Sequence, residues 1–121
     1  MYEVRMRSSF SAAHSLRHYR GKCEKLHGHN WVVEVAVTSP ALDKCDMVID
    51  FAILKKALRE VLQNLDHAYL NELTPFKKTN PSSERIAKYV FDRVGAKVPR
   101  AKVSKVLVWE TENSCAEYRG D

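Results

Sequence analysis

Alternation of apolar and polar residues predicts two strands near the start of the chain. Residues 2–10 predict the first strand, in which Tyr2, Val4 and Met6 lie on one face. The even-numbered positions continue this face through Ala12 to His14. Residues 29–38 predict the second, the strongest strand signal in the sequence, with the apolar positions Trp31, Val33, Val35 and Val37. Each strand therefore offers one apolar face to a core.

A helix is predicted after Asp50, a residue type that caps helix N-termini. Apolar residues then recur at steps of three and four, at Phe51, Leu54, Leu58, Val61 and Leu65. This stripe must pack on another element, and the sheet is the expected one.

A second helix is predicted after Asn80-Pro81, with Ser82 or Ser83 as its N-cap and with Gly95 as its end. Glu84 would lie favourably near the positive end of the helix dipole. The inward face would consist of Ile86, Val90 and Val94.

The C-terminal part predicts a strand over Lys102–Glu110 and a short partner over Ala116–Arg119. The element order is strand, strand, helix, helix, strand, strand, and short connections cannot form parallel crossovers. We therefore predict one α+β domain over residues 1–121, with a four-stranded antiparallel sheet and both helices on one face.

The composition fits a small soluble domain, with 121 residues of which 45% are hydrophobic and 29% charged. No apolar run approaches the roughly 20 residues that span a bilayer, so no membrane association is expected. The N-terminal segment lacks the apolar stretch of a signal peptide, which predicts a cytoplasmic location. In that reducing compartment, free thiols are expected at Cys23, Cys45 and Cys115.

A net charge of +5 fits a nucleic acid, a phosphorylated small molecule or merely a solvated basic surface. Lys and Arg are spread along the chain, and no basic run is interleaved with aromatic residues. The sequence thus contains no nucleic-acid-binding motif, and no nucleic acid partner is expected.

Three histidines form the candidate metal site. His27 and His29 are two residues apart, so in an extended backbone both rings can point to one ion. His14, on the same parity as Ala12, is the best third ligand, and three histidines with an open position are typical of catalytic zinc. His18 lies in a polar turn, where a solvated surface role is expected.

Cys23 is a candidate base, because the nearby Lys22 and Lys25 favour the thiolate. It could also be a fourth, structural zinc ligand or an inert loop thiol. Cys45 and Cys115 have no companion at a useful spacing, and we expect them to be packing residues.

Two carboxylates are further candidates. Asp66 could hold the imidazole of its neighbour His67 in one tautomer, although such a pair is also common as a helix cap. Glu110 shares parity with Val106 and Val108, so it needs a partner on an otherwise apolar face. That partner is either the guanidine-like edge of a heterocycle such as a pterin, or a Lys or Arg side chain.

Five motifs together resemble the 6-pyruvoyl-tetrahydropterin synthase superfamily over essentially the whole chain. The Cys-x-x-x-His-Gly-His spacing and the tail Tyr118-Arg119-Gly120 are similar to its bacterial 6-carboxytetrahydropterin synthase branch. The motifs are Phe10-Ser11-Ala12-Ala13-His14, Cys23-Glu24-Lys25-Leu26-His27-Gly28-His29, Asp66-His67, Asn80-Pro81-Ser82-Ser83-Glu84 and Trp109-Glu110-Thr111.

The resemblance implies a tunnelling fold, with subunits joined through their sheets into barrel-shaped trimers and two trimers stacked as a homohexamer. Sites in this family lie between subunits. The family pattern implies zinc on His14, His27 and His29, with Cys23 as proton acceptor. It further implies a relay of His67 with Asp66, expected from a neighbouring subunit, and a pterin anchor of Glu110 assisted by Ser82, Ser83 and Glu84.

The implied reaction converts 7,8-dihydroneopterin triphosphate and water to 6-carboxy-5,6,7,8-tetrahydropterin, acetaldehyde and triphosphate, on the way to queuosine. Lys22 and Lys25 are candidates to meet the triphosphate. The alternatives are a 6-pyruvoyl-tetrahydropterin synthase, a structural zinc protein that also uses Cys23, and a basic module that binds nucleic acid.

Overall fold

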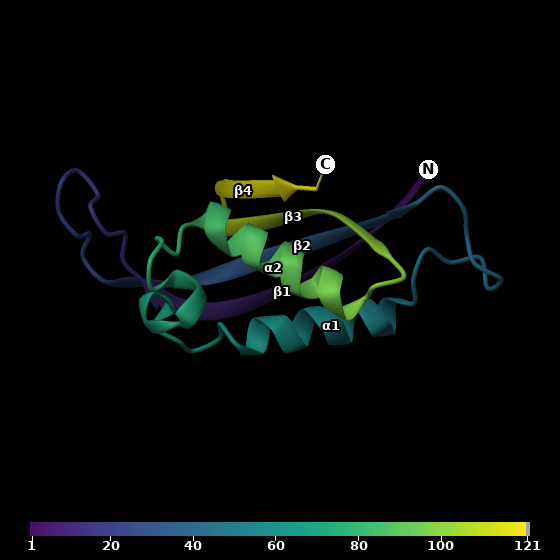
Figure 1. The fold of residues 1–121 in the computed structure, drawn as a ribbon, viewed down its shortest axis with the longest axis horizontal. Helices are drawn as coiled ribbons and strands as arrows, with labels where there is room; N and C mark the ends of the chain where they lie inside the picture. The colour runs from purple at the N-terminus through teal and green to yellow at the C-terminus, as the bar shows by residue number, and fades with distance from the viewer. Residues whose placement is uncertain (121) are drawn as a thin grey trace.

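The chain forms an antiparallel sheet of four strands in the order β1-β2-β3-β4, with two α-helices packed on one face (Figure 1). The computed structural model describes residues 1–120. This architecture and the predicted element order are confirmed. The elements are β1 (Tyr2–His14), β2 (His27–Ser39), α1 (Phe51–Gln63), η1 (Leu70–Glu72), η2 (Thr74–Phe76), α2 (Ser83–Lys97), β3 (Lys102–Thr111) and β4 (Ser114–Arg119).

The predicted alternation places the core between the sheet and the helices. Trp31 on β2 and Val106 on β3 are fully buried on the inward face, where Leu58 of α1 and Val90 of α2 cover them. Phe51 was expected in the inward stripe of α1, but it is 57% exposed because it begins the helix at the end of the molecule. Leu65 is buried as predicted, although α1 ends before it, at Gln63.

Both predicted helix starts are confirmed by their caps. Asp50 Oδ1 accepts the backbone N–H of Ala52 at 2.8 Å, and Ser82 Oγ accepts that of Arg85 at 3.2 Å. Between residues 82 and 83, the structure therefore selects Ser82 as the N-cap.

The predicted end of α2 at Gly95 is wrong, because the helix continues to Lys97. Val98 supplies the reason: its side chain is only 5% exposed and its N–H donates to the Val94 carbonyl at 3.1 Å. Pro99 follows directly and disfavours helical backbone at the residue before it. The helix thus ends just before this proline.

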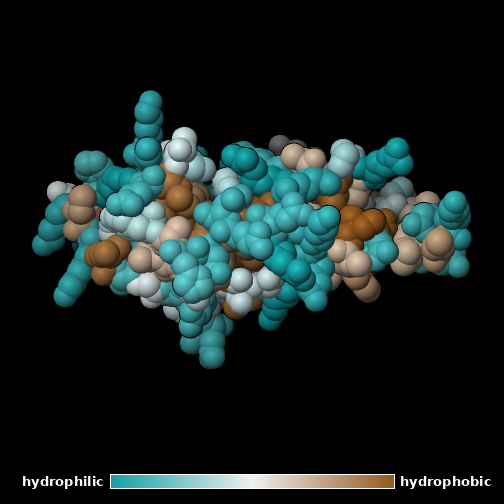
Figure 2. All heavy atoms as spheres, turned by 90° about the horizontal axis from the view of Figure 1, so that it is seen from below, coloured by the Kyte–Doolittle hydropathy of each residue, from teal (hydrophilic) through white to brown (hydrophobic). Residues whose placement is uncertain are grey.

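The surface seen in Figure 2 is mostly hydrophilic, with separate apolar areas between charged side chains. None of the helices in residues 1–120 is long and apolar enough to cross a membrane. Several large apolar side chains near the start of β1 and of α1 remain exposed: Tyr2, Leu42, Met47, Phe51 and Ile53.

Candidate metal centre

The sheet brings His14, His27 and His29 together at one end of its inward face. His14 ends β1 and stands directly opposite His27, the first residue of β2, and His29 follows on the same side of β2. Ligand atoms of these three residues and of Glu110 all lie within 4.8 Å of one another. Antiparallel pairing thus gathers residues that are 13 and 15 positions apart.

Backbone carbonyls fix the orientation of two of the rings. The Nδ1 atom of His14 lies 2.8 Å from the carbonyl oxygen of Pro81, and that of His27 lies 2.9 Å from the carbonyl oxygen of Lys25. A carbonyl oxygen only accepts hydrogen bonds, so each Nδ1 must carry the proton that it donates. In the neutral rings, both Nε2 atoms are then free to bind a metal.

The spacing of these Nε2 atoms suits a zinc ion. They lie 3.1 Å apart. Two nitrogen ligands at about 2.0–2.1 Å from a tetrahedral zinc ion are separated by roughly 3.3 Å. The pair could therefore accept zinc after a shift of a few tenths of an ångström.

The Nε2 atom of His29 is buried and has no hydrogen-bond partner among the described residues. Burial is the main cause that lowers the pKa of His29, and His14 and His27 lower it further, against the opposite effect of Glu110. A buried polar atom without a partner is costly in free energy. A divalent cation between the rings would remove this cost, so the residues fit the expected zinc.

Trp31 closes the inner side of the cluster. Its ring meets those of His14 and His29 edge-on, with centroids 4.9 and 5.1 Å apart, and it is fully buried. The ring of Phe10 stacks with the ring of Trp31, with centroids 5.8 Å apart. Access to the cluster is therefore from the side opposite the hydrophobic core.

Glu110 lies at the open side of the cluster. Its Oε1 atom is 3.3 Å from Nε2 of His29, and its Oε2 atom accepts a hydrogen bond from Ser83 Oγ at 3.4 Å. The β3 ladder is irregular between Trp109 and Thr111, which releases Glu110 from regular pairing. One third of its side chain is exposed, so the carboxylate could face a ligand as well as an ion.

The other residues expected to assist Glu110 differ in position. Ser82 caps α2, so its hydroxyl oxygen already accepts a backbone N–H, while Glu84 is exposed in the first turn of α2. Of the three expected helpers, Ser83 alone contacts Glu110 through its side chain among the described residues.

Cys23 lies exposed in the loop between β1 and β2. Among the described residues, the group of side chains that could hold a metal ion contains no cysteine. Lys22 and Lys25 in the same loop are also exposed, as is His18, which confirms its expected surface position. The three cysteines are free, as expected. The expectation that Cys45 and Cys115 pack in the interior is wrong, because both are exposed on polar segments.

The Asp66-His67 pair is fastened to the edge strand β1. Asp66 Oδ1 accepts the N–H of Ser11 at 2.9 Å, and His67 donates its own N–H to the Ser11 carbonyl at 2.6 Å. The Ser11 N–H, and then His67, hold the pKa of Asp66 below its usual value. Asp66 Oδ2 lies 3.0 Å from Nδ1 of His67, so the carboxylate orients the ring rather than capping α1.

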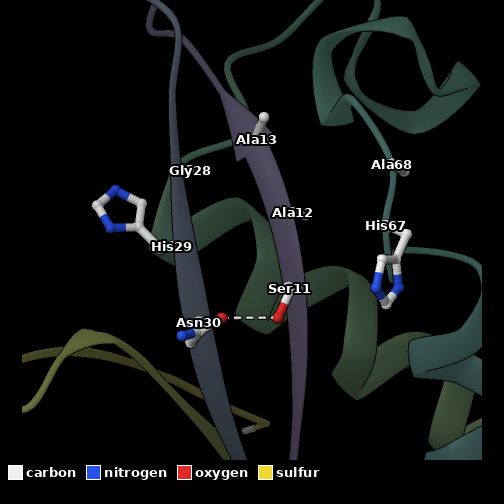
Figure 3. Close-up of a pocket in the computed structure, with 8 residues that line it drawn as sticks. All are labelled: Ser11, Ala12, Ala13, Gly28, His29, Asn30, His67 and Ala68. Carbon is white, nitrogen blue, oxygen red and sulfur yellow. Dashed lines mark hydrogen bonds between the residues drawn. The ribbon is translucent and has the colours of Figure 1, made fainter.

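His67 does not join the histidine cluster within one chain. In Figure 3, His29 and His67 lie on opposite sides of the β1–β2 pair, with the hydrogen bond of Ser11 to Asn30 between them. The imidazole of His67 is 84% exposed. An open groove of about 420 Å³ lies at this place and is lined by Ser11, Ala12, Ala13, Gly28, His29, Asn30, His67 and Ala68.

The sequence analysis missed the backbone carbonyls of Pro81 and Lys25. No residue type marks a carbonyl that orients a ligand, although the Asn80-Pro81 motif lay close to one of them. The left-handed backbone of His67, with φ of 58°, also had no signal in the sequence.

Comparison with known proteins gives a consistent result. The sequence profile described as 6-pyruvoyl tetrahydropterin synthase matches residues 3–121. The chain is 40% identical to a 6-carboxy-5,6,7,8-tetrahydropterin synthase of Synechocystis sp., covering 98% of this chain and 93% of that protein. It is 34% identical to human 6-pyruvoyl tetrahydrobiopterin synthase, covering 98% and 85%.

The fold agrees with these relatives. The structure of 6-pyruvoyl tetrahydropterin synthase from Caenorhabditis elegans superposes with a TM-score of 0.86 at 29% identity, covering 99% of this chain and 96% of that one. The four-stranded sheet with two helices is thus the tunnelling fold of these proteins. The sequence motifs, the fold and the relatives together place the chain in the 6-pyruvoyl tetrahydropterin synthase family.

Proposed function

We propose that this protein is a zinc-dependent 6-carboxytetrahydropterin synthase, a lyase of the cytoplasm that acts in queuosine biosynthesis. Its reaction would convert 7,8-dihydroneopterin triphosphate and water to 6-carboxy-5,6,7,8-tetrahydropterin, acetaldehyde and triphosphate. The observation that carries the proposal is the buried Nε2 of His29, which makes no hydrogen bond within residues 1–120 although Glu110 Oε1 lies 3.3 Å away, beside two rings whose Nε2 atoms are also free for a metal. The names of the relatives from Synechocystis and Aquifex aeolicus support the same activity.

When bound, the zinc ion would act as a Lewis acid toward oxygen atoms of the substrate side chain. His14, His27 and His29 would hold it, and the hydrogen bonds to Pro81 and Lys25 would keep the first two rings oriented. Glu110 would accept hydrogen bonds from the pterin edge, with Ser83 holding the carboxylate in place.

Proton transfer is assigned to Cys23 and His67. Cys23 would remove a proton from the substrate, and its exposed position in the loop leaves the thiol accessible to a ligand. His67 would carry a proton, with Asp66 fixing its Nδ1 side. Both groups are exposed in the single chain, which is suited to a site completed by a neighbouring subunit.

Assembly into trimers and hexamers would build that site. The outer edge of β1 is bonded to residues 66–69 only at Ser11 and Ala13, and the rest of that edge and the outer edge of β4 have no strand partner among the described residues, so the sheets of three subunits could pair edge to edge. Asp66 and His67 are bonded to the outer edge of β1 at Ser11 and would thereby reach the three histidines of the next subunit. Ser82 and Glu84 remain candidates for pterin contacts within that assembly.

The decisive experiment is an anaerobic assay of the zinc-loaded protein with 7,8-dihydroneopterin triphosphate. We expect acetaldehyde in equal amount to a product with the mass of 6-carboxytetrahydropterin. Absence of acetaldehyde from a protein with full zinc content would reject the proposal.

The second candidate is a 6-pyruvoyl-tetrahydropterin synthase, which the identity of 34% to the human protein favours. It would release triphosphate and a product with the mass of 6-pyruvoyltetrahydropterin, without acetaldehyde. A structural zinc protein would instead show Cys23 among the metal ligands, and a nucleic-acid-binding module would bind RNA regardless of chelators.

A further inference from the structure

Two asparagines pair the segment that follows β1 with a distant part of the chain. The side-chain amide of Asn71 donates to the Ser15 carbonyl at 2.8 Å and accepts the Ser15 N–H at 2.9 Å. The side-chain amide of Asn80 donates to the Arg17 carbonyl at 3.0 Å and accepts the Arg17 N–H at 2.7 Å. Each amide thus makes the two hydrogen bonds that a neighbouring strand would make, at alternate residues.

The side chain of Arg17 strengthens this connection. Its Nη1 atom donates to the carbonyls of Phe76 at 2.9 Å and Thr79 at 2.8 Å, and Nη2 donates to that of Asn71 at 3.0 Å. Arg17 forms no ion pair within residues 1–120. A permanently charged group with five donors in a rigid fork is therefore used here to gather backbone carbonyls.

These hydrogen bonds hold both partners of the bond that orients His14 at the candidate metal site. Ser15 directly follows His14, and Asn80 directly precedes Pro81, whose carbonyl accepts the Nδ1–H of His14. His14 is only 1% exposed, so water cannot readily replace that carbonyl. Neither end can shift without breaking bonds to Asn71, Asn80 or Arg17.

We propose that Arg17, together with Asn71 and Asn80, is a positioning residue that keeps His14 in its Nδ1–H tautomer with Nε2 directed at the metal. None of the three is among the side chains that could hold the metal ion. This inference rests on the proposed function, since it assumes that His14 binds the ion. It gives Asn80, a conspicuous part of the Asn-Pro-Ser-Ser-Glu motif, a role that pterin binding does not require.

The test compares Arg17→Ala with Arg100→Ala, which removes an exposed arginine of the same chain as a matched control. Zinc affinity is measured by competition with a chromophoric chelator. We expect the affinity of Arg17→Ala to fall about 10- to 100-fold, as for other groups that orient metal ligands. Arg17→Lys should recover only part of it, because an ammonium group cannot reach three carbonyls at once.

A second readout separates positioning from general stability. Nitrogen-15 NMR of the metal-free protein, with its rings neutral, reports the tautomer of His14 directly. We expect the Nδ1–H form alone in the wild type and both forms in Arg17→Ala. A merely structural role would lower Tm and leave the tautomer unchanged.

Unchanged zinc affinity and an unchanged His14 tautomer in Arg17→Ala would overturn the inference. If that variant does not fold, Asn80→Asp decides by the same two measurements, because it keeps the acceptor for the Arg17 N–H but replaces the donor to the Arg17 carbonyl with a charged oxygen that repels it. If wild type and His14→Ala bound zinc equally weakly, the proposed function would fail. The tautomer measurement would still test Arg17 in that case.

Discussion

The Nε2 atoms of His14 and His27 face each other at 3.1 Å, although each ring already donates its Nδ1 proton to a backbone carbonyl. Two neutral rings in this arrangement direct lone pairs at each other, which is unfavourable. A cation between them turns the repulsion into coordination. The arrangement therefore predicts how the cluster responds when a ligand or the metal is removed.

Removal of one imidazole should abolish tight zinc binding. We expect wild-type protein to bind one zinc ion per chain and His27→Ala to bind it at least about 100-fold more weakly, since it loses a ligand and not only an orienting group. Metal content after dialysis against a weak chelator, by mass spectrometry, checks this. His18→Ala is the control, because His18 is exposed in a turn. Equal zinc content in all three proteins would place the metal elsewhere.

Zinc should stabilise the folded state. A free zinc concentration about 100 times Kd adds about 2.7 kcal/mol to the free energy of unfolding, which corresponds to a rise in Tm of roughly 10 °C for a chain of this size. Calorimetry of the metal-free and zinc-loaded protein measures the shift. His14→Ala should show almost none of it, and a full shift in that variant would exclude His14 as a ligand.

Glu110 should affect the pterin more than the metal. Glu110→Gln keeps the shape but removes the charge, so we expect weaker binding of a reduced pterin, about 10-fold or more, with little change in zinc affinity. Fluorescence titration with a pterin and chelator competition with zinc give the two values. A large loss of zinc affinity instead would identify the carboxylate, 3.3 Å from His29 Nε2, as a metal ligand.

Sites shared between subunits should be restored by mixing inactive chains. Cys23→Ala and His67→Ala are each expected to be inactive. After refolding together in equal amounts, about a quarter of the interfaces would combine an intact Cys23 with an intact His67 from the adjacent subunit. Steady-state activity near that fraction supports the shared site. If the mixture stayed as inactive as its components, both residues would have to come from one chain.

Asp66 should make stability depend on pH in the acid range. Its folded pKa lies below the ordinary value of 3.8, first because the Ser11 N–H binds the ionised form. Its contribution is therefore complete above about pH 5 and is lost as pH falls through the lowered folded pKa. Asp66→Asn lacks this dependence. Urea unfolding from pH 3 to pH 7 should show the two proteins converging toward acid, and a gap that widens there would contradict the assignment.

Local signals explain why much of the fold could be predicted. Alternation is a direct consequence of strand geometry, and it placed His14 and Trp31 on one face. The caps at Asp50 and Ser82 depend on residues two or three positions away. The end of α2 was missed because Val98 is drawn into the core, a tertiary effect that Gly95 alone does not reveal.

The site was predicted less completely, because parts of it depend on backbone position. His14, His27 and His29 could be grouped from spacing and parity, but their orientation depends on carbonyls of Pro81 and Lys25 that any residue type would supply. The position of His67 depends on its left-handed backbone and on contacts with Ser11. Neither follows from the adjacent Asp66.

The direct pairing of His14 with His27 has a consequence for folding. A slip of one residue between β1 and β2 would turn every side chain of β1 to the opposite face, including His14. A chain with that mispairing could offer zinc only two of its three imidazoles. Zinc binding would thus favour correctly paired chains over mispaired ones. The ion would stabilise the correct register of β1 and β2 before any substrate binds.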